Sequence, residues 1–569
     1  MESRAAAWSR MRAWAGKIPG REDHVTLGLS IVIGAFVGLV IVAFILLTGR
    51  LAARMYPADG AAFRRLLVPT LGSLVTGYLL WRFFPDARGS GIPQTKFAIF
   101  ITDGYISTRT VLGKFFCCSV SLASGIALGR EGPSVQIGAG IASVLGRRFG
   151  LSKKNVKALI PVGSSAALAA AFNTPIAAVL FSLEEILGDL HAPVLGSVVL
   201  SSATSWMVLH LILGDEPLFH VPAYHLVNPA ELLIYAVLGV VGGLGSVFFV
   251  KLLLKIRSWF MKLPASTIWI QPVAGGLFVG TLGLFVPEVL GVGYDYVERV
   301  LGGDMLLTSV ALLAVLKIFA TATCYSSGNA GGIFGPSLFI GATIGGVVGS
   351  IAHSLVPTWT ADPGAYALVG MGAAFAGIVR TPLTSVIMIF EMTRDYSIIV
   401  PLMISNLISY FVSYKLQPQP IYEALAHQQG IVLPGAESRE HFERMRVADI
   451  MRKDDPIRAE SSLASIAERL KENTRNAWPV TNSEGLSGVM TRAQAGAAAN
   501  AGTVGDLISP GSAFPYIYPD QPLSLALEKM GEAGIDVLPV VSRADVHTLL
   551  GVVTLTETLD AYGVGRGTL

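Results

Sequence analysis

The chain has 569 residues, of which 52% are hydrophobic and only 14% are charged. Soluble domains carry about 25% charged residues, so this composition indicates a membrane protein with several spans rather than a soluble one. The net charge of +3 is too small to suggest a nucleic-acid partner.

Residues 1–24 form a basic segment ahead of the first apolar run. Because lysine and arginine collect on the cytoplasmic side of membrane spans, we expect this segment to be cytoplasmic and to lie at the bilayer surface. The first apolar run is too long for a signal-peptide core. Apolar stretches of spanning length then recur at 25–48, 66–81, 231–254, 269–291 and 305–322.

A fifteen-residue segment occurs twice. The copies that begin at Gly132 and Gly335 are identical at nine of fifteen positions. A second pair of blocks follows in the same order, 174–184 and 381–391, and in each a Thr-Pro pair precedes a glutamate by ten residues. Two matching blocks in the same order indicate an internal duplication of the fold.

We therefore expect a membrane domain at 25–422 that is built from two related halves, at about 25–212 and 229–422. Glycine is dense in the runs 124–140 and 328–350. Such runs predict helices that break at membrane depth, which is tolerated only where the backbone is buried in protein or lines a polar path. The fold class expected is an α-helical polytopic membrane protein with inverted repeats.

The composition changes after Tyr422. A polar stretch at 423–445 is predicted to be a linker, and residues 446–569 have soluble character. This last region is again twofold, with units at about 446–498 and 502–565. Each unit has an amphipathic helix pattern, short β-branched runs and a further helix, so we expect an α/β pair.

Each copy of the repeated segment begins with a Gly-Pro helix start, whose first amides have no partner inside the helix. Such a start attracts anions. In the first copy Glu131 stands at this point, and its equivalent in the second copy is Phe334. We expect the first half to carry an anion of its own and the second half to leave its amides free.

Four stretches can bring hydroxyls, helix-start amides and a cation to one anion. Taken singly they are unspecific, because a serine-glycine turn before a helix is usually a cap and a lone tyrosine is usually an interfacial anchor. The combination is more specific than its parts. The candidate anion-binding residues are Ser90, Gly91, Arg130, Ile333, Phe334 and Tyr422.

With these motifs in this order, the chain resembles the CLC family of chloride channels and chloride/proton exchangers, which carry motifs like GSGIP, GREGP and GxFxP. The paired soluble units are similar to the CBS tandem of many members. By motif match, the hydroxyls of Ser90 and Tyr422 would contact the central anion, Ile333 and Phe334 would donate backbone amides, and Glu131 would be the external gate.

The resemblance further implies an inverted-repeat homodimer, with a separate anion path in each subunit. It places the protein in the lipid bilayer of a bacterial plasma membrane, with the CBS pair in the cytoplasm. Chloride and protons would be its passengers. No metal site is expected, because the cysteines lie in apolar stretches without metal-ligand spacing.

The gate role of Glu131 also has a physical basis. A carboxylate is an anion that competes with chloride for one position, and once protonated it loses that attraction and can move aside. An ionised carboxylate inside the bilayer costs roughly 2.5–3.5 kcal/mol or more, so its presence calls for a function. The alternative is a salt bridge from Glu131 to Arg130 or Lys114.

The pair Glu184-Glu185 bears on whether the protein is an exchanger or a channel. Glu184 has a counterpart in the repeat, Glu391, so both are expected to belong to the scaffold. The counterpart of Glu185 is Met392. Glu185 is therefore the candidate for an internal proton relay, and the resemblance aligns it with the internal proton glutamate of exchangers. The alternative is an interfacial acid paired with a nearby basic residue.

For the soluble pair, the resemblance implies adenine-nucleotide sensing. The CBS signature places an acid three residues after a threonine, where it holds ribose hydroxyls. That position is Gln494 after Thr491 and Glu557 after Thr554, so only the second unit keeps an acid. Thr554 and Glu557 are thus the candidate nucleotide contacts, and a structural, dimer-supporting role without a cofactor is the alternative.

The leading hypothesis is a chloride/proton antiporter that uses Glu131 and Glu185, and it is not an enzyme. The alternative is a passive chloride channel of the same fold. A membrane hydrolase is disfavoured because the chain has no HExxH or GxSxG pattern. A metal transporter gated by its CBS pair is also disfavoured, because few acids cluster at membrane depth.

Overall fold

The computed structural model describes residues 21–57, 61–190, 193–215, 217–222, 224, 226–431, 445–472, 475–497, 502–508 and 514–561. The chain divides into two compact units, one that ends at Leu433 and one that begins at Pro434. Residues 1–20 of the expected basic segment and 432–444 of the expected linker lie outside the described residues.

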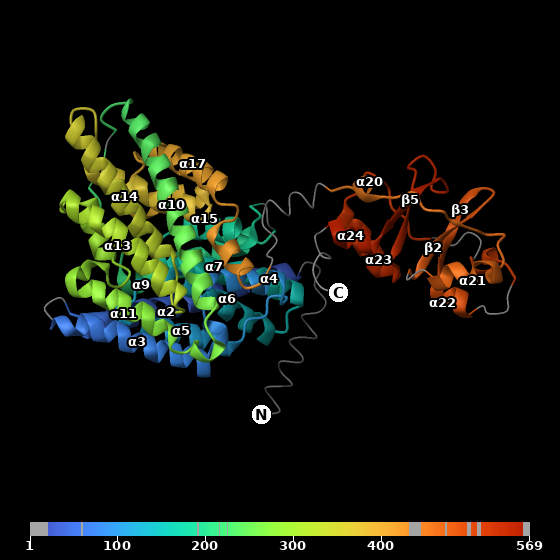
Figure 1. The fold of residues 1–569 in the computed structure, drawn as a ribbon, viewed down its shortest axis with the longest axis horizontal. Coiled ribbons are helices and arrows are strands. Elements are labelled where there is room, and N and C mark those ends of the chain that lie inside the picture. The colour runs from blue at the N-terminus through green and yellow to red at the C-terminus, as the bar shows by residue number, and fades with distance from the viewer. Residues whose placement is uncertain are drawn as a thin grey trace. The chain divides into compact units, whose positions relative to one another are not determined.

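The secondary-structure elements of the first unit are all helices in the part of the chain that the structure describes (Figure 1). Within the described ranges, seven helical segments of this unit are long and apolar enough to cross a membrane. Its first half contains α2 (Arg21–Met55), α3 (Ala62–Arg82), α4 (Ile92–Phe100), α5 (Thr108–Ala123), α6 (Glu131–Arg148), α7 (Lys153–Phe172), α8 (Pro175–Phe181), the π-helical turn η2 (Ser182–Leu187) and α9 (Leu195–Leu213).

The second half follows the same plan and lies mostly in the green to orange part of Figure 1. Its helices are α10 (Glu231–Met261), α11 (Gln271–Phe285), α12 (Tyr294–Leu301), α13 (Leu307–Ser326), α14 (Phe334–Leu355), α15 (Pro363–Val379), α16 (Pro382–Thr393), α17 (Ile399–Leu416) and α18 (Ile421–His427). Short 3₁₀ turns occur at Pro85–Ala87, Ala265–Thr267 and Pro287–Val289.

The expected helix breaks separate α5 from α6 and α13 from α14, at the glycine-dense runs. Two further breaks, which the sequence did not predict, also occupy equivalent places in the two halves. Helix α7 ends at Asn173, which has a left-handed φ of 60°, and α15 ends at Arg380, with a φ of 68°. A left-handed residue stops a helix, and proline in the first turn starts the next one. Pro175 and Pro382 accordingly begin α8 and α16.

Glycines allow the helices of each repeat to approach closely. A Cβ added to Gly138 of α6 would collide with the carbonyl oxygen of Gly163 in α7. The second half repeats this contact between Gly341 of α14 and Gly370 of α15. The equivalent helix pairs α6–α7 and α14–α15 therefore pack through the same glycine-to-backbone contact, as expected for a duplicated fold.

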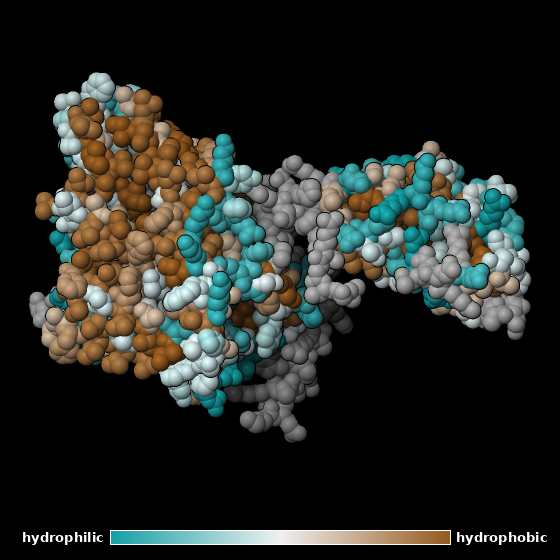
Figure 2. Space-filling model, in the orientation of Figure 1, coloured by the Kyte–Doolittle hydropathy of each residue, from teal (hydrophilic) through white to brown (hydrophobic). Residues whose placement is uncertain are grey.

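The outer face of the first unit is apolar. Figure 2 shows hydrophobic residues over the face formed by α10, α13 and α14. Side chains such as Leu233, Phe248, Leu312 and Val315 are each about half exposed or more. A contiguous apolar surface of this kind suits contact with lipid rather than with water.

One domain boundary differs from the sequence-based expectation. The linker was expected to begin at residue 423, yet α18 continues to His427 and belongs to the first unit. The physical reason is the apolar segment Ala424-Leu425-Ala426, which is buried. Because the residues that flank this segment are polar, the sequence did not indicate that the helix continues for one more turn.

The second unit has two α/β halves. Its elements are α20 (Val447–Ile450), β1 (Ile457–Arg458), α21 (Leu463–Glu472), β2 (Ala477–Asn482), β3 (Gly485–Thr491), α22 (Arg492–Ala497), η5 (Val504–Leu507), α23 (Leu523–Ala533), β4 (Val537–Val541), β5 (Leu549–Thr554) and α24 (Leu555–Ala561).

In the first of these halves β1 pairs parallel with β2, and β2 pairs antiparallel with β3. In the other, β4 and β5 form an antiparallel pair. Each half has its own hydrophobic core, one around Trp478 and Met490 and the other around Leu538 and Val553. The paired architecture expected for residues 446–569 is thus confirmed.

Candidate anion-binding site

The two copies of the repeated motif meet at their helix starts. The Gly129 amide donates to the Gly332 carbonyl, and the Gly332 amide donates to the Gly129 carbonyl, both at 2.7 Å. Gly129 and Gly332 occupy equivalent positions just before α6 and α14. The reciprocal pair therefore joins the two halves symmetrically and brings both helix starts to one place.

The carboxylate of Glu131 lies at the start of the opposite helix. Its Oε2 accepts from the Gly335 amide of α14 at 3.1 Å, and its Oε1 accepts from the hydroxyl of Tyr294. The side chain is fully buried. This differs from the expectation that the anion of the first half would serve its own helix and leave the second half free, because the twofold arrangement makes α14 the nearer partner.

Ser90 and Tyr422 meet the main geometric requirement for an anion site. Both hydroxyl oxygens are buried, and neither makes a hydrogen bond of ordinary geometry among the described residues, although Ser90 lies close to Tyr325. Leaving a buried hydroxyl unsatisfied costs about 1–3 kcal/mol, so these groups call for an acceptor that the protein does not supply. Tyr422 also lies within electrostatic range of both Glu131 and Glu185.

The turn that carries Ser90 is held by a buried lysine. Lys114 Nζ donates to the carbonyls of Ala87 and Gly89, at 2.9 and 2.7 Å. Lys114 therefore binds backbone carbonyls, which disfavours it as one of the two salt-bridge partners, Arg130 or Lys114, that were weighed for Glu131. The backbones also touch, because a Cβ on Gly132 would lie 2.6 Å from the Ser90 carbonyl oxygen.

Gly91 differs from its expected role as an amide donor to the anion. Its amide donates to Gln94 Oε1 at 2.9 Å, and Gln94 Nε2 donates to the Arg88 carbonyl at 3.2 Å. Gln94 thus caps the start of α4 and occupies the amide. The contribution of Gly91 is a left-handed backbone, with φ of 106°, and close contact with Gly132.

Ile333 and Phe334 lie at the start of α14, beside the Glu131 carboxylate. Amides in the first turn of a helix have no partner within it and face outward from the helix end. The Phe334 ring packs among three other phenylalanines, with ring centres 4.7 Å from Phe172, 5.4 Å from Phe181 and 4.4 Å from Phe375. The buried space beside this helix start is therefore apolar.

Arg130 lies next to the Glu131 assembly. Its guanidinium is 5.5 Å from the centre of the Tyr294 ring, a cation–π distance. The buried Nε of Arg130 has no hydrogen-bond partner within the described part of the chain. A cation with an unused donor is available beside the carboxylate.

The two scaffold glutamates bind across the duplication. Glu184 accepts from the Thr384 amide at 2.8 Å, at the start of α16. Glu391 accepts from the amides of Ile176 and Ala177, at 3.0 and 2.7 Å, at the start of α8. Each half thus caps a helix of the other, and the two glutamates are structural equivalents.

Glu185 has a different environment. It is buried, and its Oε1 lies 2.9 Å from Lys96 Nζ on α4. Glu423 of α18 approaches the same nitrogen at 3.9 Å. The pairing with a basic residue that was weighed as the alternative is therefore present, at a position buried within the protein.

Sequence reasoning missed Lys96, Glu423 and Tyr294. The only available signal for Lys96 was a lysine one turn into an apolar helix. Tyr294 and Glu423 carried no recognisable pattern, because their partners are distant in the sequence.

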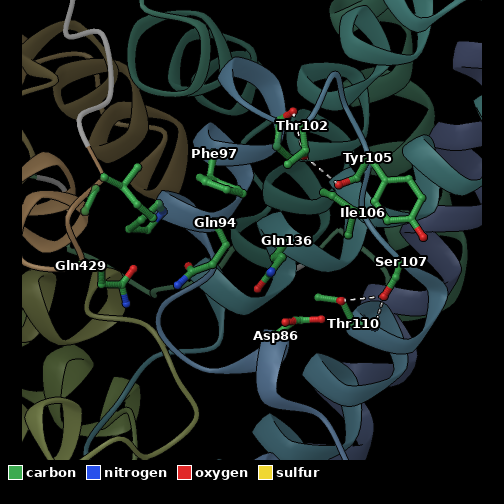
Figure 3. Close-up of a pocket in the computed structure, with 14 residues that line it drawn as sticks. Asp86, Gln94, Phe97, Thr102, Tyr105, Ile106, Ser107, Thr110, Gln136 and Gln429 are labelled. Carbon is green, nitrogen blue, oxygen red and sulfur yellow. Dashed lines mark hydrogen bonds between the residues drawn. The ribbon is translucent and has the colours of Figure 1, made fainter. Parts of the chain in front are cut away.

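A cavity of about 340 Å³ lies beside the start of α4 (Figure 3). Its described lining residues include Gln94, Gln136 and Phe97, and Asp86 is the one charged side chain among them. A negative charge disfavours anions, so this cavity is not the anion position. Neither Ser90 nor Glu131 lines it.

In the second unit, the candidate nucleotide residues already have partners. The Thr554 amide donates to Glu557 Oε2 at 3.3 Å, and the Glu557 amide donates to Thr554 Oγ1 at 3.2 Å, which caps α24. Glu557 Oε1 also lies 2.8 Å from Arg452 Nε. A ribose would have to compete with Arg452 for this carboxylate.

Comparison with known proteins accords with this geometry. The family model of the voltage gated chloride channel matches residues 72–414, which is more than half of the chain. The CBS domain model matches residues 504–563. A chloride channel protein of Ralstonia nicotianae, ClcB-like by name, is 35% identical over 383 residues, which cover 66% of this chain and 89% of the relative.

The H(+)/Cl(-) exchange transporter ClcA of Vibrio campbellii is 34% identical over 358 residues, which cover 62% of this chain and 76% of the relative. Among solved structures, a slow cyanobacterial Cl-/H+ antiporter is similar with a TM-score of 0.66 at 28% identity, covering 71% of this chain and 97% of that one. The chain therefore belongs to the voltage gated chloride channel (CLC) family, and its second unit contains a CBS domain.

Proposed function

We propose that this protein exchanges chloride for protons across a membrane, with Glu131 as the gate that replaces chloride and Glu185 as the internal proton relay. The observation that carries the proposal is the position of the Glu131 carboxylate on the Gly335 amide of α14. A helix start that binds a carboxylate can bind chloride when the carboxylate leaves.

Protonation of Glu131 explains why its carboxyl group leaves the start of α14. A neutral carboxyl group loses its attraction for the positive end of α14, and chloride takes its place. A chloride ion deeper in the site would accept hydrogen bonds from the hydroxyls of Ser90 and Tyr422, which make no other hydrogen bond of ordinary geometry within the described residues. Because one position alternates between a proton-carrying group and chloride, the two movements are coupled.

Glu185 gives the proposal its second half. It is a buried acid whose repeat equivalent is Met392, so it serves no duplicated scaffold contact. Two named exchangers among the relatives, from Vibrio campbellii and a cyanobacterium, favour the same reading. The second candidate is a passive chloride channel, which the name of the Ralstonia relative favours.

A flux assay separates the two. Purified protein in liposomes with a chloride gradient is expected to drive uphill proton movement, and Glu185→Ala should abolish it while chloride still passes. Glu391→Ala is the matched control, because it removes a partly buried acid of the scaffold. Chloride flux without protons in the wild type would refute the exchanger and leave the channel.

The same proposal covers the surroundings of the site. The protein would act as a homodimer in a bacterial plasma membrane, with its N-terminus and CBS pair in the cytoplasm. The Arg452–Glu557 pair favours a structural role for the second unit over adenine-nucleotide binding.

A further inference from the structure

Glu185 belongs to a three-residue ionic cluster that joins two helices of the anion site. Lys96 Nζ lies 2.9 Å from Glu185 Oε1 and 3.9 Å from Glu423 Oε1. The side chains of Lys96 and Glu185 are each 7% exposed, and that of Glu423 is 22% exposed. One buried cation therefore faces two acids, of which only Glu423 reaches solvent appreciably.

The other titratable groups around Glu185 do not balance this charge. Glu184 lies beside it in η2, but its carboxylate is bound to the amide and hydroxyl of Thr384. Tyr422 on α18 is neutral with an unpartnered hydroxyl. When Glu185 and Glu423 are both ionised, the cluster of Lys96 and the two acids carries one net negative charge.

A proton relay at this position poses a problem for Lys96. If Glu185 takes up a proton, its carboxyl group becomes neutral and no longer compensates the lysine. A buried ion that loses its partner is strongly destabilised. Proton uptake by Glu185 therefore requires a second anion within reach of Lys96.

We propose that Glu423 is this alternate counter-ion, and that Lys96 moves between Glu185 and Glu423 as Glu185 gains and loses its proton. The inference rests on the proposed function. In the step, a proton from the internal solution adds to the Glu185 carboxylate and forms a neutral carboxyl group. Lys96 keeps its three protons and shifts its ion pair to Glu423, and proton release reverses both changes.

The location of the cluster connects protons to chloride. Lys96 lies on α4, whose start follows the Ser90 turn, and Glu423 is the neighbour of Tyr422 on α18. A shift of Lys96 between the two acids pulls differently on the two helices that carry the anion-facing hydroxyls. Lys96 and Glu423 are thus positioning residues for the exchange reaction.

The test uses the full-length protein in liposomes, with coupled proton flux measured against internal pH. In Glu423→Gln, Lys96 keeps only Glu185, so protonation of Glu185 strands the cation. We expect the pH profile to shift to more acidic values by about one to two units, each unit being a tenfold change in proton occupancy. Lys96→Met removes the attraction between the Lys96 ammonium group and the ionised Glu185 carboxylate. We therefore expect the pH profile to shift by a similar amount to more alkaline values.

The double variant Lys96→Met/Glu423→Gln separates this role from a structural one. Because Glu423 acts through Lys96, the double variant should match Lys96→Met alone. Lys96→Arg keeps the cation and should retain the wild-type profile, which also covers the case in which Lys96→Met fails to fold. Glu298→Gln, which removes an acid paired with His220, is the control for charge loss elsewhere.

The outcomes are distinct. Opposite shifts in the single variants, with no added effect of Glu423→Gln in the Lys96→Met background, support the inference. The inference is wrong, while the proposed function stands, if the wild type couples protons to chloride but Glu423→Gln leaves the pH profile unchanged. Additive shifts in the double variant lead to the same conclusion. Chloride flux without protons in the wild type overturns the proposed function and this inference with it.

Discussion

The hydroxyl of Tyr294 is expected to control how easily chloride displaces Glu131. It donates to Glu131 Oε1, while the Gly335 amide donates to Oε2. Both oxygens of the Glu131 carboxylate therefore accept a hydrogen bond. The one from the Gly335 backbone does not depend on a side chain, whereas the one from Tyr294 is removed by a substitution. Tyr294→Phe removes one hydrogen bond and keeps the ring, which packs at 5.6 Å against Phe219.

The size of the effect follows from the charge on the acceptor. Glu131 is fully buried, and a hydrogen bond to a charged group contributes about 1.5–3 kcal/mol. Since about 1.4 kcal/mol corresponds to a factor of ten, loss of the hydroxyl should weaken the hold on the carboxylate roughly 10- to 150-fold. Chloride competes with this carboxylate, so its apparent affinity should rise by about tenfold or more.

Chloride binding to the purified variant by calorimetry measures this directly, and flux in liposomes at graded chloride concentrations tests it in the membrane. Tyr296→Phe is the matched control, because it removes a hydroxyl from the same helix at a residue whose ring faces Arg299. Equal chloride affinity in the wild type and Tyr294→Phe would refute the reasoning.

Two further predictions concern the scaffold. Glu391→Gln weakens the cap that Glu391 gives to the amides of Ile176 and Ala177, and we expect a loss of about 1–2 kcal/mol in stability, measured by thermal unfolding in detergent, with proton coupling retained. A lost proton gradient in this variant would contradict its scaffold role. At the end of α9, Arg394 and then His210 lower the pKa of Asp215 to about 2. Because the pKa is depressed, the stabilisation is complete above the unfolded value of about 3.9 and disappears as the pH falls through about 2. Asp215→Asn should therefore lower the melting temperature at pH 7 and leave it unchanged near pH 2, whereas equal effects at both values would exclude this linkage.

Much of the architecture could be predicted from local patterns. The copies that begin at Gly132 and Gly335 revealed the duplication, because close helix packing and helix starts need the same small residues and prolines in both halves. The Thr-Pro pairs supplied a second matching block of the repeat, and in the structure they stand at the equivalent starts of α8 and α16, at Pro175 and Pro382. The absence of a repeat partner for Glu185 singled it out from Glu184.

Contacts between segments that are distant in the sequence were beyond such patterns. The carboxylate of Glu131 binds Gly335, Glu184 binds Thr384, and Glu185 binds Lys96, and in each case the partners lie far apart in the chain. A periodicity or a motif describes one segment, whereas these pairs depend on how two segments are oriented after folding.

By itself, the sequence determined a duplicated membrane protein with helix starts suited to an anion and with acids near them, since composition, repeats and turn residues act locally. The tertiary structure alone decided that Glu131 occupies the helix start of the other half and that Lys96 stands between two acids. The physical reason is that charge and hydrogen-bond partners are chosen by distance in space, which the twofold packing of the halves sets.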